Sequence, residues 1–272
     1  MQFVTLNGVS LHYRTVGDVR ARPLIAFVNS LGTDFRIWDD VVARLGSDFG
    51  AVLYDERGHG LSSIGTPPYR MDDHAADLAA LIDHVGAQRA ILCGVSMGGQ
   101  VAMALSALRP DLVAALVLCD TAPRIGDDVF WNARIAAIDR GGLAAIVDGV
   151  MERWFAASFR SSDNALYIGC RAMFARQPAD GYIGSCIAVR EAELTAAARR
   201  IKTPTVCVVG ENDGSTPPAL VRSLADLIPG ARYEIISGAG HLPCVEQPAA
   251  LAEIVRTLAA GLEMESMSHV PS

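Results

Sequence analysis

The 272-residue sequence contains no run of 18 apolar residues, and its first residues carry neither a basic cluster nor an apolar stretch. These two absences argue against a membrane-spanning helix and a secretory signal peptide. The six cysteines show no CxxC spacing, and Cys93, Cys119 and Cys207 lie inside apolar runs, where cysteine behaves as a small hydrophobic residue. We therefore expect a cytoplasmic protein with no disulfide framework and no zinc site.

The sequence also lacks an excess of positive charge. Lysine and arginine total 23 against 30 aspartates and glutamates, which gives a formal net charge of −7. Because nucleic acids and anionic membranes are bound through basic patches, neither is expected as a partner. The overall field would not attract an anionic substrate either, so a local arginine would have to recognise it.

Turn signals and apolar runs indicate a mostly parallel sheet. Asn7-Gly8 separates two short strand-like segments, 3–6 and 9–13, and favours a tight antiparallel hairpin. Six later runs are almost continuously apolar, as expected of strands covered by helices on both faces, and amphipathic segments such as 72–85 separate them. These runs cover residues 24–29, 51–55, 90–94, 114–119, 205–210 and 233–237.

The interval 123–198 breaks this alternation of strands and helices. It reads as several helices inserted between two strands, which predicts a helical cap over the carboxyl ends of the strands. Residues 1–122 and 199–262 would form one α/β core, for which 51% hydrophobic residues are ample. Residues 263–272 show no periodicity and are expected to be disordered.

The segment GVSMGG at residues 94–99 follows a predicted buried strand and precedes a predicted helix. This pattern is typical of a nucleophile elbow, in which a sharp strand-to-helix turn holds a serine above the sheet and flanking glycines leave room for the crossing chain. Ser96 is therefore the candidate nucleophile.

A serine needs a histidine base and an acid that orients the histidine. His241 is the candidate base, because it follows a late strand on a glycine-containing loop. Asp213 is the preferred acid, since it lies in the loop after the preceding strand; Asp120, at the end of the 114–119 run, is the alternative. The chain order Ser96, Asp213, His241 is that of α/β-hydrolases.

Acyl transfer also needs amide donors for the oxyanion. The Met97 N–H directly follows the nucleophile at the start of a helix, where unpaired amides favour negative charge. A second donor is expected from the loop after the 24–29 strand, and Leu31 N–H is the candidate.

The sequence resembles the α/β-hydrolase superfamily through the elbow and the string YDERGHGLS at residues 54–62. Within it, CDTAPRIG at 119–126, WNARI at 131–135 and RWF at 153–155 are similar to 3-oxoadipate enol-lactonases. The string NSLGT at 29–33 resembles that family's oxyanion loop, whereas Asp120 stands where the family often has asparagine. The resemblance implies opening of the enol-lactone of 3-oxoadipate in the β-ketoadipate pathway of aromatic degradation.

Such a substrate is a small anionic lactone, and its hydrolysis needs no metal or organic cofactor. The Trp131 N–H and the Arg134 guanidinium, three residues apart on one side of a helix, are the candidates for binding its carboxylate. Two alternatives remain open: a carboxylesterase or carbon–carbon bond hydrolase of the same fold, and a non-catalytic ligand receptor. Oligomeric state cannot be read from the sequence.

Overall fold

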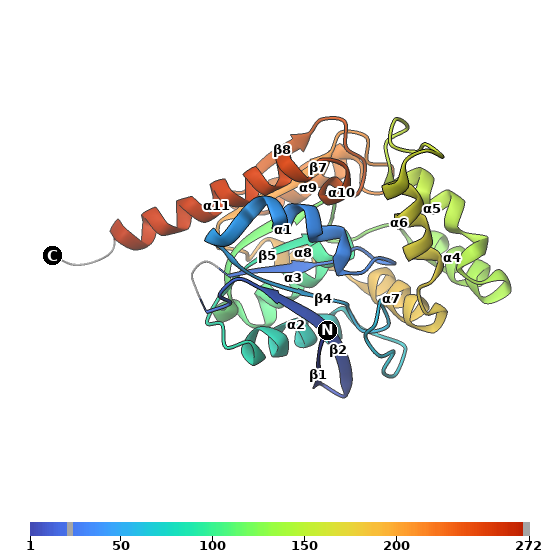
Figure 1. Ribbon diagram of the computed structural model, residues 1–272, viewed down its shortest axis with the longest axis horizontal. Coiled ribbons are helices and arrows are strands. Elements are labelled where there is room, and N and C mark those ends of the chain that lie inside the picture. Colours follow the sequence, from blue (N-terminus) through green and yellow to red (C-terminus); the bar gives the residue numbers. More distant parts are fainter. Residues whose placement is uncertain (21–23, 269–272) are drawn as a thin grey trace.

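The computed structural model describes residues 1–20 and 24–268, with the backbone alone over 263–268. An eight-stranded sheet with the order β1-β2-β4-β3-β5-β6-β7-β8 forms its centre (Figure 1). β1 and β2 pair antiparallel, β2 pairs antiparallel with β4, and the six strands from β3 to β8 are parallel to one another. The strands are β1 (Gln2–Leu6), β2 (Val9–Val16), β3 (Leu24–Val28), β4 (Gly50–Tyr54), β5 (Ala90–Val95), β6 (Val113–Cys119), β7 (Thr205–Gly210) and β8 (Arg232–Ile236).

The predicted fold class is confirmed, and the reasons lie in the sequence pattern. Asn7 and Gly8 both adopt positive φ, at 49° and 75°, which is the backbone that a two-residue turn between β1 and β2 requires. Every residue of β3, β4, β5 and β7 is buried, because helices cover both faces of the sheet.

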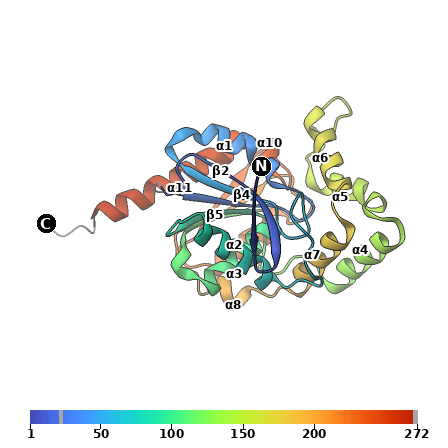
Figure 2. The same ribbon diagram turned by 60° about the horizontal axis from the view of Figure 1, so that its bottom comes forward.

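Helices flank the sheet on two sides, as Figure 2 shows. α1 (Asp39–Leu45) packs against α11 (Pro248–Ser268) on one face, whereas α2 (Met71–His84) packs against α3 (Met97–Leu108) on the other. α9 (Pro218–Leu227) lies against β7, and the short α10 (Pro243–Glu246) precedes α11. The first nine residues of α3 are all buried, as expected for the central helix that follows the elbow.

Four helices inserted between β6 and β7 gather at one end of the sheet, apart from the helices that flank it (Figures 1 and 2). They are α4 (Asp128–Gly141), α5 (Val147–Trp154), α6 (Ala165–Ala175) and α7 (Ala179–Glu191). A fifth helix of the insertion, α8 (Thr195–Ala198), packs against α3 and α9 instead. The helices of the cap proper therefore end with α7, and α8 lies with the core.

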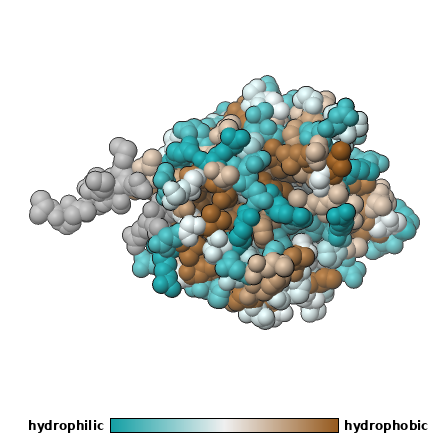
Figure 3. Space-filling model, in the orientation of Figure 1, coloured by the Kyte–Doolittle hydropathy of each residue, from teal (hydrophilic) through white to brown (hydrophobic). Residues whose placement is uncertain are grey.

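The C-terminal segment differs from the expectation of disorder. α11 continues to Ser268, because residues 263–267 contain glutamate and methionine, which favour helix. Residues 269–272 lie outside the described residues. No helix in the described part of the chain has the length and hydropathy to cross a membrane. On the face drawn in Figure 3, hydrophilic residues are interspersed with hydrophobic ones.

Candidate active site

Ser96 occupies a strained turn between β5 and α3. Its φ of 59° and ψ of −118° are rare for a residue with a side chain. Glycines make the turn possible: a Cβ on Gly94 would lie 2.3 Å from the Gly98 carbonyl oxygen, and one on Gly98 would lie 2.2 Å from the Val28 carbonyl oxygen. The turn is held by a bond from Ser96 N–H to the Cys119 carbonyl, 2.9 Å long. The backbone therefore has the geometry of a nucleophile elbow.

His241 and Asp213 form a buried hydrogen-bonded pair. The Nδ1 of His241 lies 3.0 and 2.9 Å from the two carboxylate oxygens of Asp213. Asp213 also accepts the Ser215 N–H at 2.7 Å and the Thr216 hydroxyl at 2.6 Å. Burial alone would raise the pKa of Asp213, but the charge and hydrogen bond of His241 together with these donors lower that pKa to about 2. The arrangement keeps Asp213 ionised and fixes the histidine ring.

Asp120, the alternative acid, is not hydrogen-bonded to His241. Its Oδ1 accepts the Gly210 N–H at 2.8 Å, whereas its buried Oδ2 has no hydrogen-bond partner among the described residues. Burial and the neighbouring Asp213 raise the pKa of Asp120 well above its ordinary value. The acid paired with the histidine is thus the preferred one, Asp213.

A cavity of about 500 Å³ opens over the elbow, beneath α4 and α5 of the cap. It brings together residues that are more than 200 positions apart in the sequence. Six of the seven predicted site residues line the cavity, namely Leu31, Ser96, Met97, Trp131, Arg134 and His241. The seventh, Asp213, is hydrogen-bonded to His241.

The two predicted oxyanion donors lie at this cavity with their amides unused. Among the described residues, neither the Leu31 N–H nor the Met97 N–H donates to a backbone or side-chain acceptor. Met97 is the first residue of α3, where an amide has no acceptor within the helix. Both amides are therefore available to a negatively charged oxygen near Ser96.

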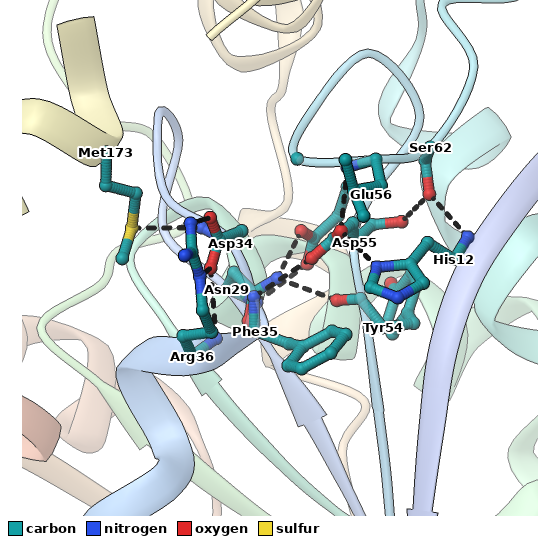
Figure 4. Close-up of polar contacts among 12 residues, drawn as sticks. His12, Asn29, Asp34, Phe35, Arg36, Tyr54, Asp55, Glu56, Ser62 and Met173 are labelled. Atoms are coloured by element: carbon teal, nitrogen blue, oxygen red, sulfur yellow. Dashed lines mark hydrogen bonds and ion pairs between the residues drawn. The ribbon is translucent and has the colours of Figure 1, made fainter. Parts of the chain in front are cut away.

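A buried network that the sequence did not reveal holds the loop of Leu31 in place (Figure 4). The Asn29 N–H and side-chain amide each donate to Glu56 at 2.7 Å, and the Trp38 indole N–H donates to the side-chain Oδ1 of Asn29 at 2.8 Å. Burial raises the pKa of Glu56 to about 8 against the effect of these bonds. The adjacent Asp55 accepts from His12 and from the Phe35 and Leu61 amides. The YDERG string therefore organises the loops beside the oxyanion donors.

The Trp131 prediction is wrong in one respect. The Trp131 indole N–H is not free to bind a substrate carboxylate, because it donates to the Ile125 carbonyl oxygen at 2.6 Å. Arg134 lies over the rings of Phe130 and Trp131, at 4.9 and 5.2 Å, and donates to the Tyr182 hydroxyl at 3.1 Å. Trp131 therefore provides a face for Arg134 instead of a donor.

A second arginine, Arg153, lines the cavity, a position that no motif in the sequence indicates. It lies 5.4 Å from the centre of the Phe130 ring, so both guanidinium groups contact one aromatic side chain. Burial and the nearby Arg134 lower the pKa of Arg153. Neither arginine forms an ion pair within the described residues. The one carboxylate that lines the cavity, Asp127, caps α4 through the Phe130 N–H.

The end of α5 is joined to the loops that carry the histidine and its acid. The His241 N–H donates to the Trp154 carbonyl at 2.7 Å, and the Gly214 N–H donates to the Arg153 carbonyl at 3.3 Å. Glu246, whose pKa burial raises to about 7, accepts from both the Ala156 and the Gly240 amides at 3.0 and 2.6 Å. The cap thus contributes directly to the position of His241.

Residues 23–248 match the family described as the alpha/beta hydrolase fold. The chain belongs to this family. A relative of this hydrolase, 3-oxoadipate enol-lactonase 2 from Acinetobacter baylyi, is 32% identical over 94% of the chain and 95% of its own length. The crystal structure of the enol-lactonase from Burkholderia xenovorans LB400 superposes with a TM-score of 0.91 at 35% identity, covering 95% of this chain and 100% of that one. A thermophilic esterase from Thermogutta terrifontis gives 0.90 at 26% identity, covering 96% and 99%.

Proposed function

We propose that this hydrolase opens the lactone ring of 3-oxoadipate enol-lactone to give 3-oxoadipate, in the β-ketoadipate pathway. Family membership and the relatives at 32% identity support a hydrolase of esters or lactones. The observation that carries the finer assignment is the pair of arginines, Arg134 and Arg153, in the cavity beside Ser96. Two cations without a carboxylate partner favour a substrate that supplies a negative charge.

The proposed reaction uses groups already arranged around the cavity. Ser96 Oγ attacks the lactone carbonyl carbon while His241 accepts the hydroxyl proton, and Asp213 stabilises the resulting imidazolium. The oxyanion of the tetrahedral intermediate accepts from the Leu31 and Met97 amides. Collapse of the intermediate breaks the ring C–O bond, and His241 returns the proton to the leaving enol oxygen.

A water molecule, activated by His241, then attacks the acyl-enzyme and releases the second carboxylate. The enol tautomerises to the ketone. An enolate leaves more readily than an alkoxide, so the proton from His241 is sufficient assistance at the leaving oxygen. None of these steps calls for a metal or an organic cofactor.

The free carboxylate of the substrate is assigned to the two arginines. The net charge of −7 does not attract an anion to the protein, so local recognition has to provide the affinity. Phe130 holds both guanidinium groups on one wall of the cavity, at 4.9 and 5.4 Å from its ring centre. A bidentate carboxylate would satisfy both and relieve their mutual repulsion.

The first test is the loss of enol-lactone absorbance, with the unstable substrate generated in situ, for the wild type and Ser96→Ala. We expect fast turnover that the substitution abolishes. A wild type no faster than buffer, which still cleaves an aryl ester through Ser96, would keep the serine chemistry and refute the lactonase assignment.

The second test separates charge recognition from catalysis. Losing a charge-assisted hydrogen bond costs about 1.5–3 kcal/mol, so Arg134→Ala and Arg153→Ala should each raise KM for the anionic lactone by about 10- to 100-fold. KM for a neutral aryl ester should change little. Arg140→Ala, an exposed position on the same helix as Arg134, is the matched control. Equal effects on both substrates would contradict the assigned role.

A carboxylesterase is the second candidate. The similarity to the Thermogutta terrifontis esterase, at 26% identity, favours it. A carboxylesterase function predicts a higher kcat/KM for a neutral ester than for the lactone.

A further inference from the structure

Asp120 is a buried carboxyl group beside the histidine–aspartate pair, and the proposed mechanism does not use it. It follows β6 directly, next to β7, and is fully buried. Its backbone is anchored by the bond from Asp120 N–H to the Val208 carbonyl, 2.8 Å long, and it has a φ of 48°. Positive φ is unfavourable for a residue with a side chain, so the fold imposes this position on the carboxyl group.

The hydrogen bonding of Asp120 is one-sided. Oδ1 accepts the Gly210 N–H, but the buried Oδ2 has no partner within the part of the chain that the structure describes. An ionised carboxylate with an unpaired buried oxygen, beside the charged Asp213, would be strongly unfavourable. A neutral acid solves both problems, because the protonated carboxyl group removes the charge and can donate a hydrogen bond to the neighbouring Asp213. Asp120, Asp213 and His241 each offer an atom within 4.8 Å of the others, so this second acid lies within reach of the histidine ring.

We infer that Asp120 is a reserve acid of the site: a positioning residue that stays neutral beside Asp213 and pairs with His241 when the Asp213 carboxylate is absent. This inference rests on the serine and histidine chemistry of the proposed function, though not on its substrate. Without Asp213, Asp120 releases its proton to solvent and remains ionised. It then orients His241 and stabilises the imidazolium that forms when the Ser96 proton is transferred.

Thr216 is the other group that could hold the ring. Its hydroxyl oxygen lies 3.3 Å from His241 Nδ1 and is released from Asp213 in an Asp213→Ala protein. A hydroxyl group can accept a hydrogen bond from Nδ1–H, but it is neutral and cannot stabilise the imidazolium charge as a carboxylate does. Any rescue by Thr216 should therefore be weaker than rescue by a carboxylate.

The test is a double-mutant cycle with an aryl ester as substrate. Removing the acid of a serine triad lowers kcat by about 10⁴-fold when nothing replaces it. We expect Asp120→Asn to stay within about threefold of wild type, Asp213→Ala to lose about 10²-fold, and the double variant about 10⁴-fold. A structural role for Asp120 predicts instead that the two single effects multiply. A double variant as active as Asp213→Ala would overturn the inference.

Two further measurements keep the result interpretable. Thr216→Val in the Asp213→Ala background should change activity far less than Asp120→Asn does in that background. The downfield NMR signal of the His241 Nδ1 proton should persist in Asp213→Ala and disappear in the double variant, and it is read without turnover. Asp213→Asn replaces Asp213→Ala if the latter does not fold. Absence of lactonase activity with these ester and NMR results intact would refute the proposed substrate alone.

Discussion

Replacing Asp213 with asparagine should change how the stability of the protein depends on pH. The pKa of this carboxyl falls from an ordinary value of 3.8 to about 2 in the folded protein. A group with a lowered pKa stabilises the folded state above its unfolded pKa, and that contribution disappears as the pH falls through the folded value. The Asp213 side chain is completely buried, so solvent does not screen its interaction with His241. The difference corresponds to about 2 kcal/mol at neutral pH.

Urea unfolding followed by tryptophan fluorescence measures this contribution. Trp38, Trp131 and Trp154 are all buried, so unfolding should change their emission. The asparagine variant loses a charge-assisted bond and should be less stable than wild type at pH 5. Between pH 5 and pH 2 the gap between the two proteins should narrow by about 2 kcal/mol, since only the wild type loses the ionised carboxylate.

A gap that stays constant over this range would refute the argument that the ion pair with His241 lowers the pKa of Asp213. The comparison should be repeated with both proteins carrying Asp120→Asn, so that no second carboxyl group titrates beside the histidine. The same narrowing is expected there.

Three further predictions concern the surroundings of the cavity. Gly181→Ala should destabilise the protein by more than about 2 kcal/mol in urea unfolding, because its Cβ would lie 2.3 Å from the Gly58 carbonyl oxygen; Gly149→Ala, a cap glycine with open space around it, should not. Glu56→Gln should lower kcat for an aryl ester by about tenfold or more with little change in KM, because its amide group would face an Asn29 donor; an unchanged kcat would show that this network does not support the oxyanion loop. Trp131→Phe removes the bond to Ile125 and should raise KM for the anionic lactone much less than Arg134→Ala does. Equal increases in KM would indicate that the indole N–H binds the substrate.

Local sequence signals were sufficient for the parts of the site that depend on chain geometry. A Cβ on Gly94 or Gly98 would lie 2.3 or 2.2 Å from a backbone carbonyl oxygen, so the turn requires the glycines of the motif. Asp213 and His241 follow neighbouring parallel strands, whose carboxyl ends meet at one edge of the sheet. Strand order therefore predicts that the two side chains meet.

Side-chain pairing between distant segments could not be predicted in this way. Arg153 acquires its place only because α5 lies against α4 through Phe130, and no spacing within 153–155 indicates that contact. The bond from the Trp131 indole to Ile125 depends on how the chain enters α4. The pairing of Asn29 with Glu56 depends on β3 lying next to β4 and on the burial of both side chains.

The hydrogen bonds between the end of α5 and the loops of His241 and Asp213 limit how this cap can diversify. Trp154 offers its backbone carbonyl to His241, so this bond depends on the path of the chain and does not involve the Trp154 side chain. Substitutions on α4, including those that alter Arg134, change the wall of the cavity without altering the bond that holds His241. A replacement of the whole cap with one from another hydrolase, in contrast, would have to reproduce the path of residues 153–156 closely enough to keep these backbone hydrogen bonds. A change on α4 can therefore alter the cavity wall alone, whereas a change of chain path at the end of α5 alters both the cavity wall and the position of His241.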